Sequence, residues 1–341
     1  MKLLIITQKV DINDDVLGFF HSWIEEFARN CEFVTVICLQ KGEYDLPDNA
    51  NVLSLGKENG VQKLKYIFNF YKHIWFERKN YDSVFVHMNQ EYVLLGGLFW
   101  KLLRKKILLW RNHPSGNFLT CIAMSLSNKI FCTSKYSFTA RSKKTVLMPV
   151  GIDMDRFKKT ETQKIKNSIL FLARISPVKK QDLLIEALNI LNKESTKFSA
   201  DFYGNSLPKD MAYAKFLKEK VKEHKLENLV HFYSGIPNAK TPDIYNQYEI
   251  FVNASPNGMY DKTIFEAMAC GCLILVSNDN LRGKISDNFI FKQGDILELS
   301  KKLEKLLNYN DEERQNASRQ LKNLAKNNSL KILSEKLFFN M

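Results

Sequence analysis

The sequence predicts an α/β protein of two domains, each with a parallel β-sheet covered by helices. Short apolar runs that are typical of buried strands alternate with helical patterns of apolar residues along most of the chain. This alternation favours parallel sheets with helices on both faces. The length of 341 residues favours two domains that each bury a core. The alternation pauses in a turn-rich stretch at residues 148–153 and then begins again, which places the boundary near residue 155.

In the first domain, residues 1–155, each expected strand is a short apolar run, and each expected helix repeats apolar residues every three or four positions. The expected strands are residues 3–6, 33–38, 83–87, 106–111 and 130–132, and the expected helices are residues 16–29, 63–79, 92–104 and 135–142.

The second domain, residues 156–325, repeats this architecture with a different sequence. Its expected strands are residues 168–173, 200–203, 230–233, 251–254 and 273–276, and its expected helices are residues 181–193, 211–224, 296–308 and 311–326, with one more between Asp261 and Gly271. A further segment near residues 241–247 is expected without an assigned type. In the final segment, residues 326–341, the pattern SLKILSEKLFFN predicts a short amphipathic helix at 329–340.

The composition favours a cytoplasmic globular protein. Apolar residues make up 45% of the chain and charged residues 26%, as in soluble domains. The six cysteines form no CxxC pair and most lie in apolar runs, which favours buried thiols over disulfides or metal ligands. The apolar run in MKLLIITQKV is too short for a signal peptide and predicts a first strand instead. The sequence contains no uncharged apolar stretch of about 18 residues, so we expect no membrane span.

The net charge of +13 is concentrated in two segments, KLKYIFNFYKHIWFERK at residues 63–79 and FWKLLRKK at residues 99–106. Helices that mix basic and aromatic residues suit an anionic bilayer surface, where each basic group adds about 1 kcal/mol. The same pattern also fits an ordinary helix that covers a sheet and extends its lysines into water. Contact with the inner face of a membrane is therefore one of two interpretations. Binding of nucleic acid is disfavoured, because no RNP, helix-turn-helix or zinc-finger pattern accompanies the charge.

The most informative stretch is FVNASPNGMYDKTIFEAMACGCLILVS, residues 251–277. Its apolar start and the turn formers at 255–258 predict a buried strand that leads into a polar loop. Asp261 stands at a helix N-cap position, and Gly271 ends the helix before a second strand. In a parallel sheet such a loop is where ligands bind, because the N–H groups of the next helix attract anionic oxygen. Glu266 lies about one turn inside this helix and could reach a hydroxyl group beside a bound phosphate. The alternative is a βαβ unit without a ligand, in which Asp261 only caps the helix.

The second domain opens with ILFLARISPVKKQDLLIEAL, which places Arg174 after a strand and Lys179 just before the next helix. Two cations at the tip of a strand–loop–helix unit suit a diphosphate, with Arg as a fork and Lys as a point charge. Two solvated charges are the alternative. No G-x-G-x-x-G follows the first strand and no Walker lysine motif is present, which disfavours a dinucleotide oxidoreductase and a P-loop NTPase. No His/Asp/Glu cluster has the spacing of metal ligands, so we expect no metal site.

Three motifs, in their order along the chain, resemble those of the family-4 retaining glycosyltransferases of GT-B fold, most strongly from residue 149 to 277. The motifs are Val150-Gly151-Ile152-Asp153 with Phe157, Arg174-Ile175 with Lys179, and Ser255 followed by FEAMACG. The resemblance implies two Rossmann-like domains with parallel sheets that face a central cleft, and a final helix that crosses back to the first domain. It also implies that the second domain binds a nucleotide sugar, such as a UDP- or GDP-sugar, and the first a glycan or lipid-linked acceptor. It implies no metal and no further cofactor.

The resemblance gives several residues a role. Arg174 and Lys179 would hold the donor diphosphate and stabilise the leaving group, and the backbone N–H groups of Thr263 and Ile264 would add to that grip. Glu266 matches the second glutamate of the family's E-x7-E motif and would bind the ribose hydroxyls.

Two histidines of the first domain also match family positions. His113 ends the run ILLWRNH, where the family often has a histidine near the donor sugar and its phosphate. His87 ends VFVH, where a histidine on the acceptor side is frequent. Either residue could instead be a core histidine or a turn residue.

The chain departs from the family at Gly258, where the first glutamate of E-x7-E would stand. That glutamate usually contacts hydroxyls of the donor hexose, so Asp261, Asn257 or a backbone N–H group would have to replace it.

From the resemblance as a whole we expect a retaining glycosyltransferase of bacterial envelope or glycan assembly. The alternatives are a catalytically impaired GT-B binding module, another GT-B enzyme such as a sugar-nucleotide epimerase or phosphorylase, and a basic nucleic-acid-binding protein.

Overall fold

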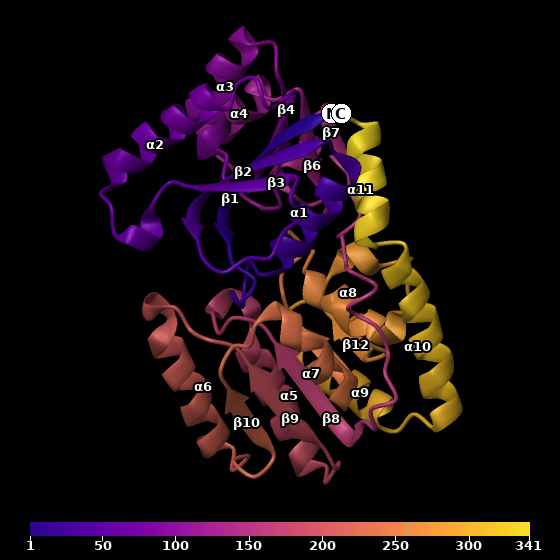
Figure 1. Cartoon of the computed structure of the whole chain (residues 1–341). Coiled ribbons are helices and arrows are strands. Elements are labelled where there is room, and N and C mark those ends of the chain that lie inside the picture. The colour runs from indigo at the N-terminus through magenta and orange to yellow at the C-terminus, as the bar shows by residue number, and fades with distance from the viewer. Residues whose placement is uncertain (259) are drawn as a thin grey trace. The chain divides into compact units, whose positions relative to one another are not determined.

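The computed structural model describes residues 1–258 and 260–341. It divides into two compact units (Figure 1). Unit 1 comprises Met1–Gly151, Pro237–Ala239 and Leu330–Met341, and unit 2 comprises the described residues of Ile152–Ile236 and Lys240–Ser329.

Unit 1 contains a seven-stranded sheet in the order β3-β2-β1-β4-β5-β6-β7, and all neighbouring strands run parallel. Its strands are β1 (Lys2–Val10), β2 (Phe33–Lys41), β3 (Ala50–Ser54), β4 (Ser83–His87), β5 (Lys106–Trp110), β6 (Lys129–Cys132) and β7 (Thr145–Leu147). Its α-helices are α1 (Phe19–Asn30), α2 (Lys63–Phe76), α3 (Glu91–Leu102), α4 (Phe118–Leu126) and α11 (Leu330–Phe339).

Helices cover both faces of the unit 1 sheet. Successive residues of a strand point to opposite faces, so neighbouring residues of β1 pack into two different clusters. Leu3 and Ile5 of β1 belong to one buried cluster, together with side chains of α1 and α11. Leu4 and Ile6 belong to a second cluster, together with side chains of α2, α3 and α4. The apolar residues 3–6 of β1 are therefore buried on both faces of the sheet.

The last helix of the chain, α11, belongs to this unit. Leu333 and Leu337 are fully buried in the first cluster. Gly151 allows the close contact, since a Cβ atom there would lie 2.6 Å from Cδ1 of Leu333 and 2.8 Å from Cζ2 of Trp23. Its φ of +78° also favours glycine, and its carbonyl accepts a hydrogen bond from Nε1 of Trp23 at 3.1 Å. The Val-Gly-Ile-Asp motif thus has a structural reason in this fold.

Unit 2 contains a five-stranded parallel sheet in the order β10-β9-β8-β11-β12. Its strands are β8 (Ile165–Leu172), β9 (Ser199–Tyr203), β10 (Val230–Tyr233), β11 (Tyr248–Asn253) and β12 (Leu273–Val276). Its α-helices are α5 (Gln181–Lys193), α6 (Met211–Glu223), α7 (Thr241–Gln247), α8 (Lys262–Ala269), α9 (Ile296–Leu307) and α10 (Asp311–Lys326).

The predicted α/β class with parallel sheets is confirmed, and so are most of the predicted elements. Gly271 ends α8 with a φ of +79°, as its position predicted. The helix expected at residues 135–142 is wrong, because that segment forms only a short 3-10 turn at Phe138–Arg141. No predicted element corresponds to β3, β7 or α4. Helix α4 is almost entirely apolar and so lacks amphipathic periodicity, although the capping box of Asn117 and Thr120 was a readable signal.

Candidate functional site

Two loops of unit 2 meet at the carboxyl edge of its sheet. β8 lies between β9 and β11, so the strand order reverses there, and ligands of open α/β sheets bind at such a switch point. The first loop follows β8 and contains Arg174. It ends in a 3-10 turn at Pro177–Lys179, and Lys180 then adopts a left-handed backbone (φ +58°) at the start of α5. The second loop joins β11 to α8. The topology thus places Arg174 and Lys179 beside the start of α8.

A carboxylate oxygen of Asp261 joins the two loops. Its Oδ2 atom accepts hydrogen bonds from Nζ of Lys179 at 2.6 Å, from Oγ of Ser255 at 2.6 Å and from Nδ2 of Asn253 at 3.0 Å. Lys179 also donates to Oγ of Ser255 at 3.2 Å. Both side chains of the Lys179–Asp261 ion pair are only 16% exposed. Lys179 and Asp261 are therefore held in a fixed geometry before any ligand binds.

The charge of Asp261 is stabilised by this environment. Burial alone would raise the pKa of its carboxyl group, but the ammonium group of Lys179 and the hydrogen bonds from Lys179, Ser255 and Asn253 outweigh burial and lower that pKa. Asp261 is thus ionised at neutral pH. Its Oδ1 atom has no donor among the described residues and could accept one from a ligand.

Asp261 occupies the predicted N-cap position of α8, but its side chain makes no capping hydrogen bond. Asp261 thus has the expected position, but the expectation that its side chain caps the helix is wrong, because Oδ2 accepts hydrogen bonds from Lys179, Ser255 and Asn253 instead. The backbone N–H of Ile264 donates to the carbonyl of Asp261 across a long 3.4 Å contact. An uncapped helix start retains the partial positive charge that favours an anion.

Buried polar atoms without partners lie in the first turn of α8 and in the segment between β8 and α5. Among the described residues, Nε of Arg174, Oε1 of Gln181 and Oγ1 of Thr263 are buried and make no hydrogen bond. Gln181 donates from its amide to the carbonyl of Arg174 at 3.0 Å, so it belongs to the same loop. A buried unsatisfied polar group costs about 1–3 kcal/mol, and a ligand with several acceptor oxygens would satisfy the Arg174 and Thr263 donors.

Glu266 lies inside α8 and is only 2% exposed. Its Oε2 atom accepts a hydrogen bond from the hydroxyl group of Tyr245 at 3.1 Å, a contact that the sequence did not reveal. Lys262 lies one turn before it. Burial lowers the pKa of Lys262 to about 7, although the charges of Glu266 and Asp153 act in the opposite direction. The start of α8 is thus densely charged.

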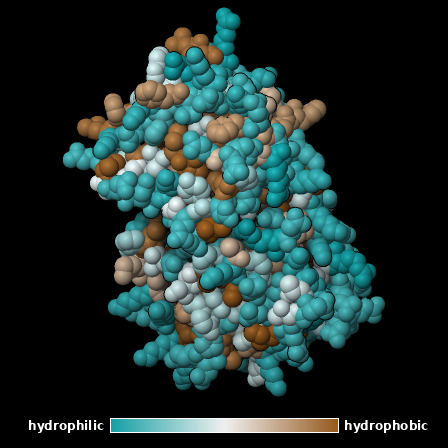
Figure 2. All heavy atoms as spheres, viewed as in Figure 1, coloured by the Kyte–Doolittle hydropathy of each residue, from teal (hydrophilic) through white to brown (hydrophobic). Residues whose placement is uncertain are grey.

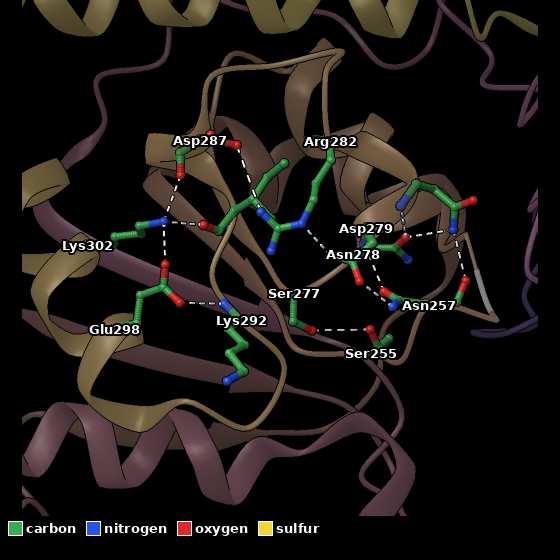
Figure 3. A network of polar contacts seen from close by, with 12 residues as sticks. Ser255, Asn257, Ser277, Asn278, Asp279, Arg282, Asp287, Lys292, Glu298 and Lys302 are labelled. Carbon is green, nitrogen blue, oxygen red and sulfur yellow. Dashed lines mark hydrogen bonds and ion pairs between the residues drawn. The ribbon is translucent and has the colours of Figure 1, made fainter.

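The loop that carries Gly258 is anchored by the network in Figure 3. Asn257 donates from Nδ2 to Oδ2 of Asp279 at 2.6 Å, and its Oδ1 accepts from the backbone N–H of Asp279 at 2.8 Å. Asp279 in turn accepts from Nε of Arg282 at 2.6 Å. Asn257 therefore uses both amide atoms on Asp279, which makes it a poorer replacement for the absent family glutamate than Asp261.

The two predicted histidines of unit 1 have different surroundings. His87 is 3% exposed, stacks on Phe20 with ring centroids 4.1 Å apart, and contacts Oγ1 of Thr7 through Nδ1 at 3.3 Å. This packing favours the core interpretation of His87. His113 is exposed in the loop after β5, and its Nδ1 contacts the backbone of Ser115. Its ring is therefore accessible to a ligand.

Within residues 1–258 and 260–341, no group of three or more His, Cys, Asp or Glu side chains is arranged to hold a metal ion. The same residues include no helix of sufficient length and apolarity to span a bilayer.

Two units with parallel sheets, one of which carries an uncapped helix and two cations at its switch point, define a two-domain α/β protein of GT-B fold. The profile of the family "Glycosyl transferases group 1" matches residues 153–324, about half of the chain and nearly all of unit 2. The chain belongs to this glycosyltransferase family.

One curated relative shares 23% identity over 171 residues, 48% of this chain. It is the UDP-N-acetylglucosamine--peptide N-acetylglucosaminyltransferase GtfA subunit of Streptococcus pneumoniae. This chain spans only about a third (32%) of that protein's length.

Solved structures of GT-B glycosyltransferases share the fold over nearly the whole chain. Anabaena Alr3699/HepE, solved with UDP, superposes with a TM-score of 0.78 at 16% identity and covers 99% of each chain. Sucrose-phosphate synthase from Thermosynechococcus elongatus superposes with a TM-score of 0.72 at 14% identity, covering 99% of this chain and 98% of its own. The lipopolysaccharide outer core galactosyltransferase WaaB superposes with a TM-score of 0.67 at 15% identity, covering 100% and 98%.

Proposed function

We propose that this chain is a retaining, metal-independent glycosyltransferase that uses a nucleotide-diphosphate sugar, such as a UDP- or GDP-hexose. The observation that carries this proposal is the arrangement of hydrogen-bond donors and positive charge at the start of α8. The loop after β8 carries Lys179 and Arg174, whose Nε is buried without a partner, and Lys179 contacts Asp261 at the uncapped start of α8. Both loops lie at the edge where the sheet order reverses. Such a set of donors suits a diphosphate. HepE has been solved with UDP and with UDP-glucose, which supports a nucleotide-sugar donor for this chain.

In this proposal the protein acts mainly by positioning and by stabilising the leaving group. Arg174, Lys179 and the backbone N–H groups of Thr263 and Ile264 neutralise the charge that develops on the departing diphosphate. Because Lys179 is already fixed by Asp261, it needs little reorganisation during the reaction. Glu266 binds the ribose hydroxyls through a carboxylate whose orientation is set by Tyr245.

Asp261 is proposed to serve the sugar as well as Lys179. Its Oδ2 positions the ammonium group, while Oδ1 accepts a hydrogen bond from a hydroxyl of the donor hexose. This would replace the glutamate that is absent at Gly258. His113 is proposed to act beside the reacting sugar, and His87 stays a prediction for the acceptor side.

The proposed acceptor is a glycan or a lipid-linked intermediate of bacterial envelope polysaccharide or glycoconjugate synthesis. The similarity to an outer-core lipopolysaccharide galactosyltransferase supports this class. We also place the enzyme in the cytoplasm, at the inner face of the membrane.

A thermal-shift screen with UDP, GDP, ADP and the corresponding sugars tests the donor proposal. A ligand at about 100 times its dissociation constant adds about 2.7 kcal/mol to the stability of the folded state. We expect one base to stabilise the protein, and its sugar nucleotides to stabilise it further. If no nucleotide diphosphate raises the melting temperature, the donor site is wrong.

Gly258 favours one alternative, a GT-B module that binds a nucleotide sugar without turning it over. Product analysis with the donor from the screen separates the two. Hydrolysis or transfer of the sugar supports the enzyme, whereas binding without either supports the module.

A further inference from the structure

Helix α2 has two apolar faces, and only one of them is used by the fold. Phe70 and Ile74 are the buried residues of this helix and belong to the core cluster on one side of the unit 1 sheet. At about 100° per residue, Leu64, Phe68, Tyr71 and Trp75 form a second stripe, directed about 110° away from the buried face. All four side chains are exposed, Phe68 by 68% and Trp75 by 52%.

Helix α3 extends this apolar surface. The rings of Trp75 and Phe99 lie 6.0 Å apart, and the hydroxyl group of Tyr71 donates to the carbonyl of Leu95 at 3.0 Å. Side chains of both helices line a groove of about 580 Å³. Leu98 and Leu102, one turn apart on α3, are 67% and 84% exposed. Large exposed apolar patches on a soluble domain mark interaction surfaces.

Basic residues border this surface. Lys65 and Lys72 project from α2 next to the stripe, Lys79 follows the helix, and all three are exposed. The guanidinium group of Arg78 lies 4.3 Å from the ring centroid of Trp75. Figure 2 shows brown hydrophobic spheres among teal hydrophilic ones in the region that Figure 1 labels α2 and α3.

We propose that α2 and α3 form a docking surface for an anionic lipid bilayer, with α2 lying along the interface. Aromatic and leucine side chains would enter the headgroup region, and the lysines and Arg78 would pair with lipid phosphates. The charge argues for lipid over an apolar protein partner or a second copy of this chain, because basic residues border the apolar stripe and Glu77 is the one acidic residue among residues 63–79. This inference takes its membrane location from the proposed function and identifies the contact surface.

Trp75 provides a direct assay for docking. The chain has four tryptophans, and the other three, Trp23, Trp100 and Trp110, are at most 2% exposed. With vesicles of equimolar phosphatidylglycerol and phosphatidylcholine, we expect co-sedimentation, a blue shift of tryptophan emission and quenching by brominated lipid. Vesicles of phosphatidylcholine alone should bind at least about tenfold more weakly, and about 1 M NaCl should reverse the binding.

Variants of the full chain locate the surface. One variant combines Phe68→Ala with Trp75→Ala, and a second combines Lys65→Gln, Lys72→Gln and Lys79→Gln. Each should weaken vesicle binding at least about tenfold. The first loses buried apolar area, and the second loses three basic groups that each contribute about fivefold. Trp75→Phe should retain binding and lose the emission shift.

Matched control variants lie on unit 2. Phe216→Ala with Leu297→Ala removes two exposed apolar side chains, and Lys215→Gln with Lys218→Gln and Lys222→Gln removes three exposed lysines. These control variants should bind vesicles as the wild type does.

Absence of vesicle binding at low salt, or equal losses in the α2 and control variants, would overturn the proposal. A concentration-dependent dimer that Phe68→Ala with Trp75→Ala abolishes, without vesicle binding, would instead assign the surface to a second copy. UDP thermal shifts measured on the same variants keep the two proposals separate, because docking variants should bind nucleotide normally even if docking fails.

Discussion

Asp261→Asn tests how one carboxylate serves both Lys179 and the donor sugar. The change keeps the size of the side chain, and an amide oxygen can still accept from Ser255 and Asn253. What it removes is the negative charge 2.6 Å from the ammonium group of Lys179. We therefore expect the variant to be less stable and to turn over the nucleotide sugar more slowly, but to bind the free nucleotide at least as tightly as the wild type.

The magnitude follows from the burial of the ion pair. Removing one partner of a fully buried pair costs about 3–5 kcal/mol, whereas an exposed pair contributes about 0–1 kcal/mol. Since both side chains are 16% exposed, we expect a loss of about 2 kcal/mol. For a unit of this size, that loss corresponds to a decrease in melting temperature of about 4–8 °C.

The pH dependence provides a second measure. The pKa of Asp261 is lowered in the folded state, so its contribution to stability is present above the unfolded pKa of about 3.9 and is lost as the pH falls through the folded value. The difference in unfolding free energy between wild type and Asp261→Asn should therefore stay constant from about pH 7 to pH 5 and shrink below about pH 4.

Nucleotide binding and turnover should separate. UDP or GDP alone should bind at least as tightly as to the wild type, because the variant lacks a negative charge near the diphosphate. Turnover of the true nucleotide sugar should fall about 10- to 100-fold, since the sugar loses a charged acceptor worth about 1.5–3 kcal/mol and Lys179 loses its fixed position.

Glu249→Gln is the matched control for this variant. Glu249 pairs with Arg314 at 3.2 Å with side-chain exposures of 14% and 18%, and it lies near the start of β11. It should lose similar stability without any change in turnover. Full activity and an unchanged melting temperature of Asp261→Asn would refute the reasoning, and wild-type activity with lower stability would limit Asp261 to positioning Lys179.

Three further predictions concern the donor site. Arg174→Ala and Lys179→Ala should each weaken nucleotide-diphosphate binding about tenfold or more in calorimetry, because a charge-assisted hydrogen bond contributes about 1.5–3 kcal/mol. The control variant Lys180→Ala should keep the wild-type affinity, and unchanged affinity in both test variants would show that this loop does not bind the diphosphate. Glu266→Gln should weaken binding of ribonucleotides more than of deoxyribonucleotides, since an amide accepts hydroxyl hydrogen bonds less strongly than a carboxylate; equal losses for the two ligands would leave Glu266 only its bond to Tyr245. His113→Ala should lower kcat much more than it weakens binding of the free nucleotide, because contacts with the reacting sugar matter mainly in the transition state; an unchanged kcat would exclude this role.

The sequence by itself determined the class of fold and most of its elements. Apolar runs and helical periodicity identified β4, β10, α5 and α10 with their observed bounds, because these segments are long or bounded by turn formers and caps. Local patterns failed for β3, whose sequence ANVLS has only two large apolar residues, for β7, which has three residues, and for α4, which lacks a polar face. The motif spacing also identified Arg174, Lys179 and the start of α8 as one candidate site, which stays a prediction.

The tertiary structure alone decided which groups meet. Lys179 and Asp261 lie 82 residues apart in the chain and touch because β8 and β11 are neighbours in the sheet. The same pairing makes Asp261 a fixed partner of Lys179 rather than a helix cap, and the bond between Glu266 and Tyr245 likewise depends on how α7 and α8 pack. Periodicity reports that α2 has apolar residues on two faces but not which face is buried, because burial depends on the sheet and on the neighbouring helix. The fold buries Phe70 and Ile74 and leaves Phe68 and Trp75 exposed.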